Sequence, residues 1–96
     1  ENDISLSIKL FEKAISIDDN AEPLLGLASC LRFKDIKLAL ELAKKALAKD
    51  PNYVNYDYRK EQLWGEKLQT STEILLQNKQ LQNDVILAKS KIDASS

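Results

Sequence analysis

Histidine is absent from this 96-residue sequence, and cysteine occurs only once, as Cys30. The missing histidine removes the commonest general base and the commonest metal ligand of proteins. A single cysteine excludes a disulfide within the chain and a cysteine-based zinc cluster. Two glycines and two prolines are too few for the many turns of a β-sandwich. We therefore expect a helical protein that is not an enzyme and that holds neither a metal nor a cofactor.

Composition and charge indicate one folded domain over residues 1–96, with 44% apolar and 30% charged residues. The longest apolar run, residues 23–31, is too short to cross a bilayer, so no membrane partner is expected. The net charge is −1, whereas nucleic-acid-binding domains are usually basic, so no nucleic-acid partner is expected either. Residues 32–60 carry an excess of positive charge, which we interpret as a solvated helix face. The chain starts without methionine or a signal peptide, so we expect a cytoplasmic fragment of a longer protein.

Apolar residues recur every three or four positions in four segments, which predicts amphipathic helices over residues 3–17, 21–33, 36–49 and 80–92. The stripes expected to face the core are Ile4, Ile8, Phe11 and Ile15; Leu24, Leu27, Ala28 and Leu31; Ile36, Ala39, Leu40, Ala43, Ala46 and Leu47; and Leu81, Val85, Ala88 and Ile92. Gly26 either costs the second segment about 1 kcal/mol of helix stability relative to alanine, or its absent side chain lets a neighbouring helix approach closely.

Short polar side chains precede the first three helices and predict their N-caps. Asn2 or Asp3 can accept hydrogen bonds from the first-turn amides of the first helix. Asp19, with Glu22 three residues later, resembles a capping box for the second helix. Asp35 is placed to cap the third helix.

The segment over residues 53–77 contains no proline and a single glycine, Gly65. One apolar face keeps its phase across this glycine, from Tyr56 through Trp64 to Leu75, which predicts a single long helix. Gly65 then faces water in mid-helix. Its replacement by alanine is expected to stabilise the fold by about 0.5–1 kcal/mol.

The sequence repeats itself at a spacing of 32 residues. At this spacing Ala14 falls on Ala46 and Asp18 falls on Asp50, so a small residue and an acidic turn recur in order. A period of roughly 32–34 residues built from helix pairs indicates a helical solenoid.

With this period, residues 5–54 resemble the tetratricopeptide repeat family. The matching positions are Leu24, Leu27, Ala28, Leu31, Ala39, Ala43, Ala46 and the closing turn Asp50-Pro51-Asn52. The resemblance implies an all-α fold of antiparallel helix-turn-helix repeats, arranged as a solenoid with a right-handed superhelix. Residues 1–20 would be the second helix of a partial repeat, 21–52 one full repeat, and 53–96 a divergent closing repeat with a capping helix.

A repeat array needs a terminal helix with a polar outside to cover its last apolar face. The helix over residues 80–92 is therefore expected to lie on Leu68 and Leu75, toward the end of the long helix. Its apolar stripe would face inward, and its Gln, Asn and Lys residues would largely face water.

In this family, the first helices of successive repeats line a concave groove that receives a peptide or helix of a partner protein. By that resemblance, the groove-facing residues are Glu22, Leu25, Ser29, Arg32, Phe33, Tyr58 and Arg59. The chain would be a protein-interaction module or scaffold that binds another protein or peptide, and the fragment itself would be a monomer or weak homodimer. The alternative is a structural end-cap of a longer repeat protein, which self-associates and has no groove of its own.

Two further groups of side chains leave alternatives open. Cys30 lies beside the apolar stripe of its helix and is either a buried, inert thiol or a partly exposed one. The aromatic residues Tyr53, Tyr56, Tyr58 and Trp64 either pack in the core and at a helix seam or form a contact surface, because Tyr and Trp are favoured at interface hot spots. Tyr58 lies off the apolar face and is expected to be exposed.

Overall fold

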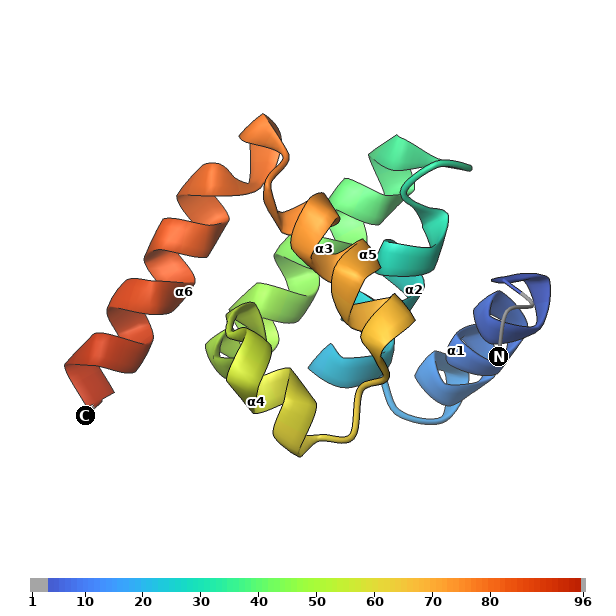
Figure 1. Ribbon diagram of the computed structural model, residues 1–96, viewed down its shortest axis with the longest axis horizontal. Coiled ribbons are helices and arrows are strands. Elements are labelled where there is room, and N and C mark those ends of the chain that lie inside the picture. Colours follow the sequence, from blue (N-terminus) through green and yellow to red (C-terminus); the bar gives the residue numbers. More distant parts are fainter. Residues whose placement is uncertain (1–3, 96) are drawn as a thin grey trace.

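The computed structural model describes residues 4–95 and shows helices joined by short turns, with no strand in that part of the chain (Figure 1). Four expected helices are present, and their bounds are α1 Ile4–Ile17, α2 Ala21–Leu31, α3 Ile36–Lys49 and α6 Gln82–Ser95. The remaining elements are two shorter helices and two 3-10 turns: α4 Tyr56–Glu61, α5 Glu66–Leu76, η1 Pro51–Val54 and η2 Lys79–Leu81. The all-α class expected from the sequence is therefore confirmed.

Helix α2 lies at the centre of the molecule, and α1, α3 and α5 pack around it (Figure 1). Eight of its 11 residues are buried, and its expected apolar stripe is among them. Leu25, outside that stripe, is buried as well. A helix that is apolar on all its sides is stable only when neighbouring elements cover each side. The core therefore surrounds α2 instead of lying along one of its faces.

Gly26 lets α1 approach α2 closely, which is the second of the two interpretations that the sequence left open. A Cβ atom at Gly26 would lie 2.6 Å from two ring carbons of Phe11, which is well inside van der Waals contact. The Phe11 ring thus fills the space of a side chain that α2 lacks. No residue of α1 is itself buried, so this helix lies on the surface of the bundle. The N-cap expected for it at Asn2 or Asp3 lies outside the described residues.

Helix α3 is confirmed over the predicted range, with the predicted cap. The Asp35 carboxylate accepts a hydrogen bond from the Leu38 amide at 3.1 Å, and Asp50 is the C-cap. The small residues of its inner face are 0% exposed; they are Ala39, Ala43 and Ala46. Small side chains on this face let α3 pack closely on its neighbours, chiefly α2.

The single long helix expected over residues 53–77 is wrong, because the chain breaks between α4 and α5. Leu63 adopts the left-handed conformation, with a φ of 69°, directly after α4. The Trp64 amide donates to the Arg59 carbonyl at 3.1 Å, and the Leu63 amide donates to the Lys60 carbonyl at 3.0 Å. These two bonds form a Schellman motif, which satisfies carbonyls at the end of α4 and ends the helix.

Leucine conceals this break in the sequence, because the left-handed position of a Schellman motif usually holds glycine. The Leu63 side chain is 91% exposed, so it gains no burial that would offset the backbone strain. Gly65, expected in mid-helix, instead has extended dihedrals and is the N-cap of α5.

Leu63→Gly is expected to stabilise the fold by about 1 kcal/mol, because glycine adopts the left-handed conformation without steric cost. Gly65→Ala is expected to change stability by less than about 0.5 kcal/mol, since alanine is a poorer N-cap but restricts the unfolded chain. Urea unfolding of both variants measures the difference. A stabilising Gly65→Ala beside a neutral Leu63→Gly would instead mean that α4 and α5 form one helix in solution.

Helix α6 lies at the end of the molecule opposite α1 (Figure 1) and packs mainly on η1 and α3. Its predicted apolar stripe, from Leu81 to Ile92, packs against the core. We expected α6 to cover the face that carries Leu68 and Leu75. This expectation is wrong, because both residues belong to α5, which packs on α2. Because the chain breaks before α5, this helix packs on α2, and α6 covers a face of α3 instead.

Asp19 and Glu22 do not form the expected capping box. The N-cap of α2 is Asn20, and its side chain makes no capping hydrogen bond. Asp19 forms ion pairs with Lys45 at 3.3 Å and with Lys49 at 3.5 Å, and so ties the α1–α2 turn to α3. The hydrogen bond from Lys45 and then the charge of Lys49 lower the pKa of the Asp19 carboxyl.

Acidification is expected to remove the contribution of Asp19 to stability. The pKa of the Asp19 carboxyl in the folded protein is below its ordinary value of 3.8. The stability that the two ion pairs contribute is therefore complete above pH 3.8 and is lost as the pH falls through the folded pKa. Asp19→Asn should therefore melt below the wild type at neutral pH and converge with it at pH values below 3.8. Added salt should also reduce the difference, since the pairs are exposed. A difference that stays constant from neutral to acidic pH would exclude the ion pairs as its cause.

Candidate functional site

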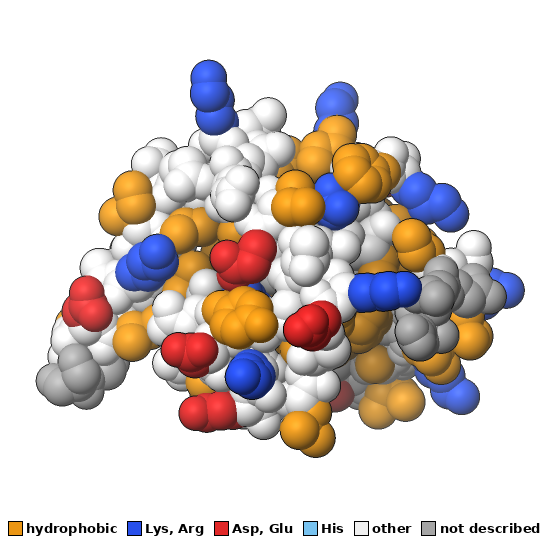
Figure 2. All heavy atoms as spheres, viewed as in Figure 1, with side chains coloured by type: hydrophobic (Ala, Val, Ile, Leu, Met, Phe, Trp, Pro, Cys, Tyr) orange, Lys and Arg blue, Asp and Glu red, His pale blue; other side chains and the backbone are white. Residues whose placement is uncertain are grey.

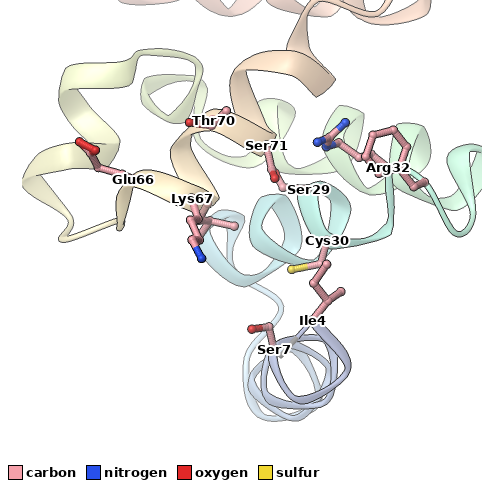
Figure 3. A pocket seen from close by; sticks show the side chains of 11 residues that line it. Ile4, Ser7, Ser29, Cys30, Arg32, Glu66, Lys67, Thr70 and Ser71 are labelled. Carbon is pink, nitrogen blue, oxygen red and sulfur yellow. The ribbon is translucent and has the colours of Figure 1, made fainter. Parts of the chain in front are cut away.

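A groove with a volume of about 560 Å³ opens between α1, the end of α2 and the first half of α5 (Figure 3). Its lining residues are Ile4 and Ser7 of α1; Ser29, Cys30, Arg32 and Phe33 at the end of α2; and Glu66, Lys67, Leu68, Thr70 and Ser71 of α5. We call this hollow the α1–α2–α5 groove. Both α1 and α5 pack on α2, so the packing of the bundle sets the width of the groove.

Helix α5 occupies the face of α2 that the family resemblance leaves open for a partner. The hydroxyl groups of Ser29 and Thr72 lie 2.7 Å apart in a buried hydrogen bond that joins the two helices. Leu25 is 0% exposed and Ser29 is 2% exposed. The expectation that Leu25 faces a partner is therefore wrong, and Ser29 contributes only a small part of the groove wall.

Arg32 and Phe33 follow α2 and form one end of the groove. The guanidinium carbon of Arg32 is 3.9 Å from the centre of the Phe33 ring, which is a cation–π contact. Phe33 is 84% exposed, so a large apolar side chain lies in solvent beside a positive charge. The structure thus brings these two predicted site residues together with Ser29 at the groove.

The placement of Arg59 at the groove rim is wrong, because this residue is 0% exposed. Its guanidinium donates to the Gln69 side-chain oxygen at 2.7 Å, to the Tyr53 carbonyl at 2.8 Å, and to the Glu73 carboxylate. Burial lowers the pKa of Arg59, and the hydrogen bond to Glu73 opposes that effect. Arg59 therefore joins η1, α4 and α5 in the interior of the protein.

The aromatic residues pack mainly against one another. The rings of Tyr53 and Tyr58 meet edge to face with centres 5.0 Å apart, and those of Tyr53 and Trp64 are 6.0 Å apart. The indole N–H of Trp64 donates to the Glu22 carboxylate at 3.1 Å. Tyr58, expected to be exposed, and Glu22 are both half-buried, and neither lines the groove. Tyr56, expected on the apolar face, is 44% exposed.

The α5 wall of the groove was not predicted from the sequence; its lining residues include Glu66, Lys67, Thr70 and Ser71. A continuous helix over residues 53–77 would not fold these side chains back toward α2. Only the left-handed residue between α4 and α5 brings them there, and the pattern of apolar residues carries no signal for it.

Cys30 lies half-buried on the wall of the groove, near Ile4 (Figure 3). Burial raises the pKa of its thiol, so the group stays protonated and weakly nucleophilic at neutral pH. The partly exposed alternative therefore describes Cys30 better than the buried one. Ile4, expected in the core stripe of α1, is 55% exposed and lines the same groove.

Residues 4–95 contain no cluster of three His, Cys, Asp or Glu side chains that could hold a metal ion. Among the same residues, no helix combines the length and the apolar character needed to cross a membrane. Comparison of the chain with protein-family models, with curated proteins and with solved structures gave no match. The tetratricopeptide resemblance therefore gains no independent support from known proteins.

Proposed function

We propose that this chain is a protein-interaction module that holds an apolar segment of a partner protein in the α1–α2–α5 groove. The observation that carries the proposal is Phe33, a large apolar side chain that is 84% exposed at the end of the groove. Arg32 lies against its ring, and aromatic and Arg side chains are enriched at the centres of protein interfaces. Exposed apolar groups that gather in one place mark interaction sites, whereas scattered ones do not.

The walls of the groove suit a protein segment. The apolar part of the lining comes from Ile4, Cys30, Phe33 and Leu68. Serine and threonine hydroxyl groups between them can bond to the backbone of a partner. The volume of about 560 Å³ lies within the range of roughly 300–1,000 Å³ that is typical of binding pockets. Because packed helices form the walls, binding would order few residues and would lose little conformational entropy.

We also propose that α1, α2 and α3 form a tetratricopeptide-like unit, with residues 21–52 as its full repeat. The close contact of Phe11 with Gly26, the buried small residues of α3 and the turn after Asp50 support this arrangement. The chain after that turn departs from the family, since two shorter helices replace the expected long one. The proposed binding surface accordingly lies beside α5 and not on an open concave face of α2.

Selection of binders from a random peptide library tests the proposed function. Enriched peptides are expected to carry large apolar residues and to slow the alkylation of Cys30, the single cysteine of the chain. Phe33→Ala should weaken their binding by about tenfold or more, as expected for an aromatic anchor. The matched control is Leu87→Ala, which removes an exposed apolar side chain from α6, at the other end of the molecule.

The control should leave the affinity of the peptides unchanged. Peptides that bind without protecting Cys30, or whose binding depends on Leu87 and not on Phe33, would place the interaction site elsewhere. A library that yields no binder at all would contradict the proposal.

A further inference from the structure

We propose that the partner in the α1–α2–α5 groove is a second copy of this chain, in a two-fold dimer joined by reciprocal ion pairs between Glu66 and Arg32. This inference rests on the proposed function, because it names the occupant of the same groove. Opposite charges at the two ends of the groove, and apolar side chains at its Arg32 end and on its α1 wall, support this arrangement.

Glu66 and Arg32 lie at opposite ends of the groove (Figure 3). Glu66 is the first residue of α5 and its carboxylate points away from the cavity, whereas the Arg32 guanidinium is held over the Phe33 ring. In a two-fold interface, the contact of residue i with residue j of the other copy is matched by the contact of j with i. An axis through the middle of the groove therefore pairs Glu66 of each copy with Arg32 of the other.

Both charged groups are available for such pairs. None of the ion pairs found within residues 4–95 involves Glu66 or Arg32. Glu66 is exposed and Arg32 is half-buried, so both still contact solvent. Lys67 lies next to Glu66, but the two side chains point in different directions (Figure 3). Arg32 of the second copy can therefore approach the carboxylate from the side away from Lys67.

Apolar side chains at the Arg32 end of the groove and on its α1 wall would supply most of the affinity of the dimer. Phe33 is 84% exposed and Ile4 is 55% exposed. Helix α1, which forms one wall, has no buried residue and also exposes Leu10. Figure 2 shows apolar side chains among Lys and Arg side chains on the side that carries α1 and the α2–α3 turn, whereas acidic side chains gather nearer the centre of the view. This distribution places basic and acidic surface beside each other on this face of the molecule.

The size and net charge of the chain also suit a dimer. A stable interface buries about 800 Å² on each partner, which is about an eighth of the 6168 Å² that this chain exposes. A net charge of −1 adds little repulsion between two copies. An unrelated partner would need its own basic and acidic groups at the same spacing, whereas a second copy already carries them.

Sedimentation equilibrium of the intact chain, from low micromolar to near-millimolar concentration, tests the proposal. The wild type is expected to dimerise, and Cys30 should become protected from alkylation as the concentration rises. Glu66→Arg or Arg32→Glu alone should raise the dimer dissociation constant by about tenfold or more, because each places two like-charge pairs in the dimer. The double charge swap should restore the constant to within about threefold of the wild type, because the pairs re-form with reversed polarity.

Glu41→Arg is the matched charge reversal at an exposed position of α3, and it should leave the dimer unchanged. Circular dichroism checks the fold of each variant, and Glu66→Gln replaces the reversal if arginine disturbs the start of α5. A wild type that stays monomeric, or a dimer that the double swap does not restore, overturns the proposal. A monomer whose Cys30 is protected by selected peptides contradicts the dimer alone, whereas a monomer that binds no peptide contradicts the proposed function as well.

Discussion

Arg59→Ala is expected to destabilise the fold by about 3–5 kcal/mol. The guanidinium is buried and holds acceptors on η1 and α5 together. Its loss leaves the Gln69 side-chain oxygen and the Tyr53 carbonyl without this donor, and each unsatisfied buried group costs about 1–3 kcal/mol. The truncation also leaves a cavity. Glu73 adds less to the loss, because its side chain is 46% exposed and regains water.

Urea unfolding followed by the fluorescence of Trp64 measures this loss, since Trp64 packs in the aromatic cluster beside Tyr53. Lys60→Ala is the matched control, because it removes the neighbouring basic side chain, which is exposed. It should change stability by less than about 0.5 kcal/mol. Arg59→Lys separates charge from geometry, since a lysine ammonium lacks the planar fork that reaches these acceptors.

Equal losses in Arg59→Ala and Lys60→Ala would show that the buried network contributes nothing specific. Full stability in Arg59→Lys would show that the site requires only a positive charge. The structure predicts neither result, because the three acceptors of Arg59 lie on two elements, η1 and α5, and need donors in different directions.

Leu81→Ala is expected to destabilise the fold by about 2–5 kcal/mol, because Leu81 is 0% exposed. It lies in η2, directly before α6, and η2 packs on α3. Truncation removes apolar contacts and leaves a cavity that the surrounding helices close only in part. The loss should also loosen α6, which contacts the rest of the molecule through η1, α3 and this turn.

Leu87→Ala is a control with the same chemistry. Leu87 lies on α6 and is 54% exposed, so its truncation should change stability by less than about 0.5 kcal/mol. Thermal melts of the two variants measure the difference, and binding of a hydrophobic dye reports whether α6 has left the core. If Leu81→Ala melts like the wild type and binds no dye, η2 does not anchor α6, and this helix becomes a better candidate for partner binding than the groove.

The candidate site was predictable only where it depends on the end of a single helix. Arg32 and Phe33 lie at the groove because they follow α2, whose range is close to the one that its apolar pattern predicts. Leu25 and Arg59 lie in the interior instead, because α5 covers Leu25 and a hydrogen-bond network encloses Arg59. The pattern of apolar and polar residues shows which side of a helix can be buried, but it does not show which neighbour covers a polar position.

The sequence by itself determined the helical class, the range of α3, its cap at Asp35 and the inward stripe of α6. Each of these depends on residues within a few positions of one another, because side-chain periodicity and capping bonds are local properties. Tertiary structure alone decided the break at Leu63 and the path of the chain after it. A leucine keeps the left-handed conformation only where other contacts compensate for its strain, and burial of Arg59 and Trp64 on either side supplies them. Because of that break, α5 packs on α2 and α6 packs on α3. The groove lies between α1, α2 and α5, so its position depends on contacts between residues that are distant in the sequence.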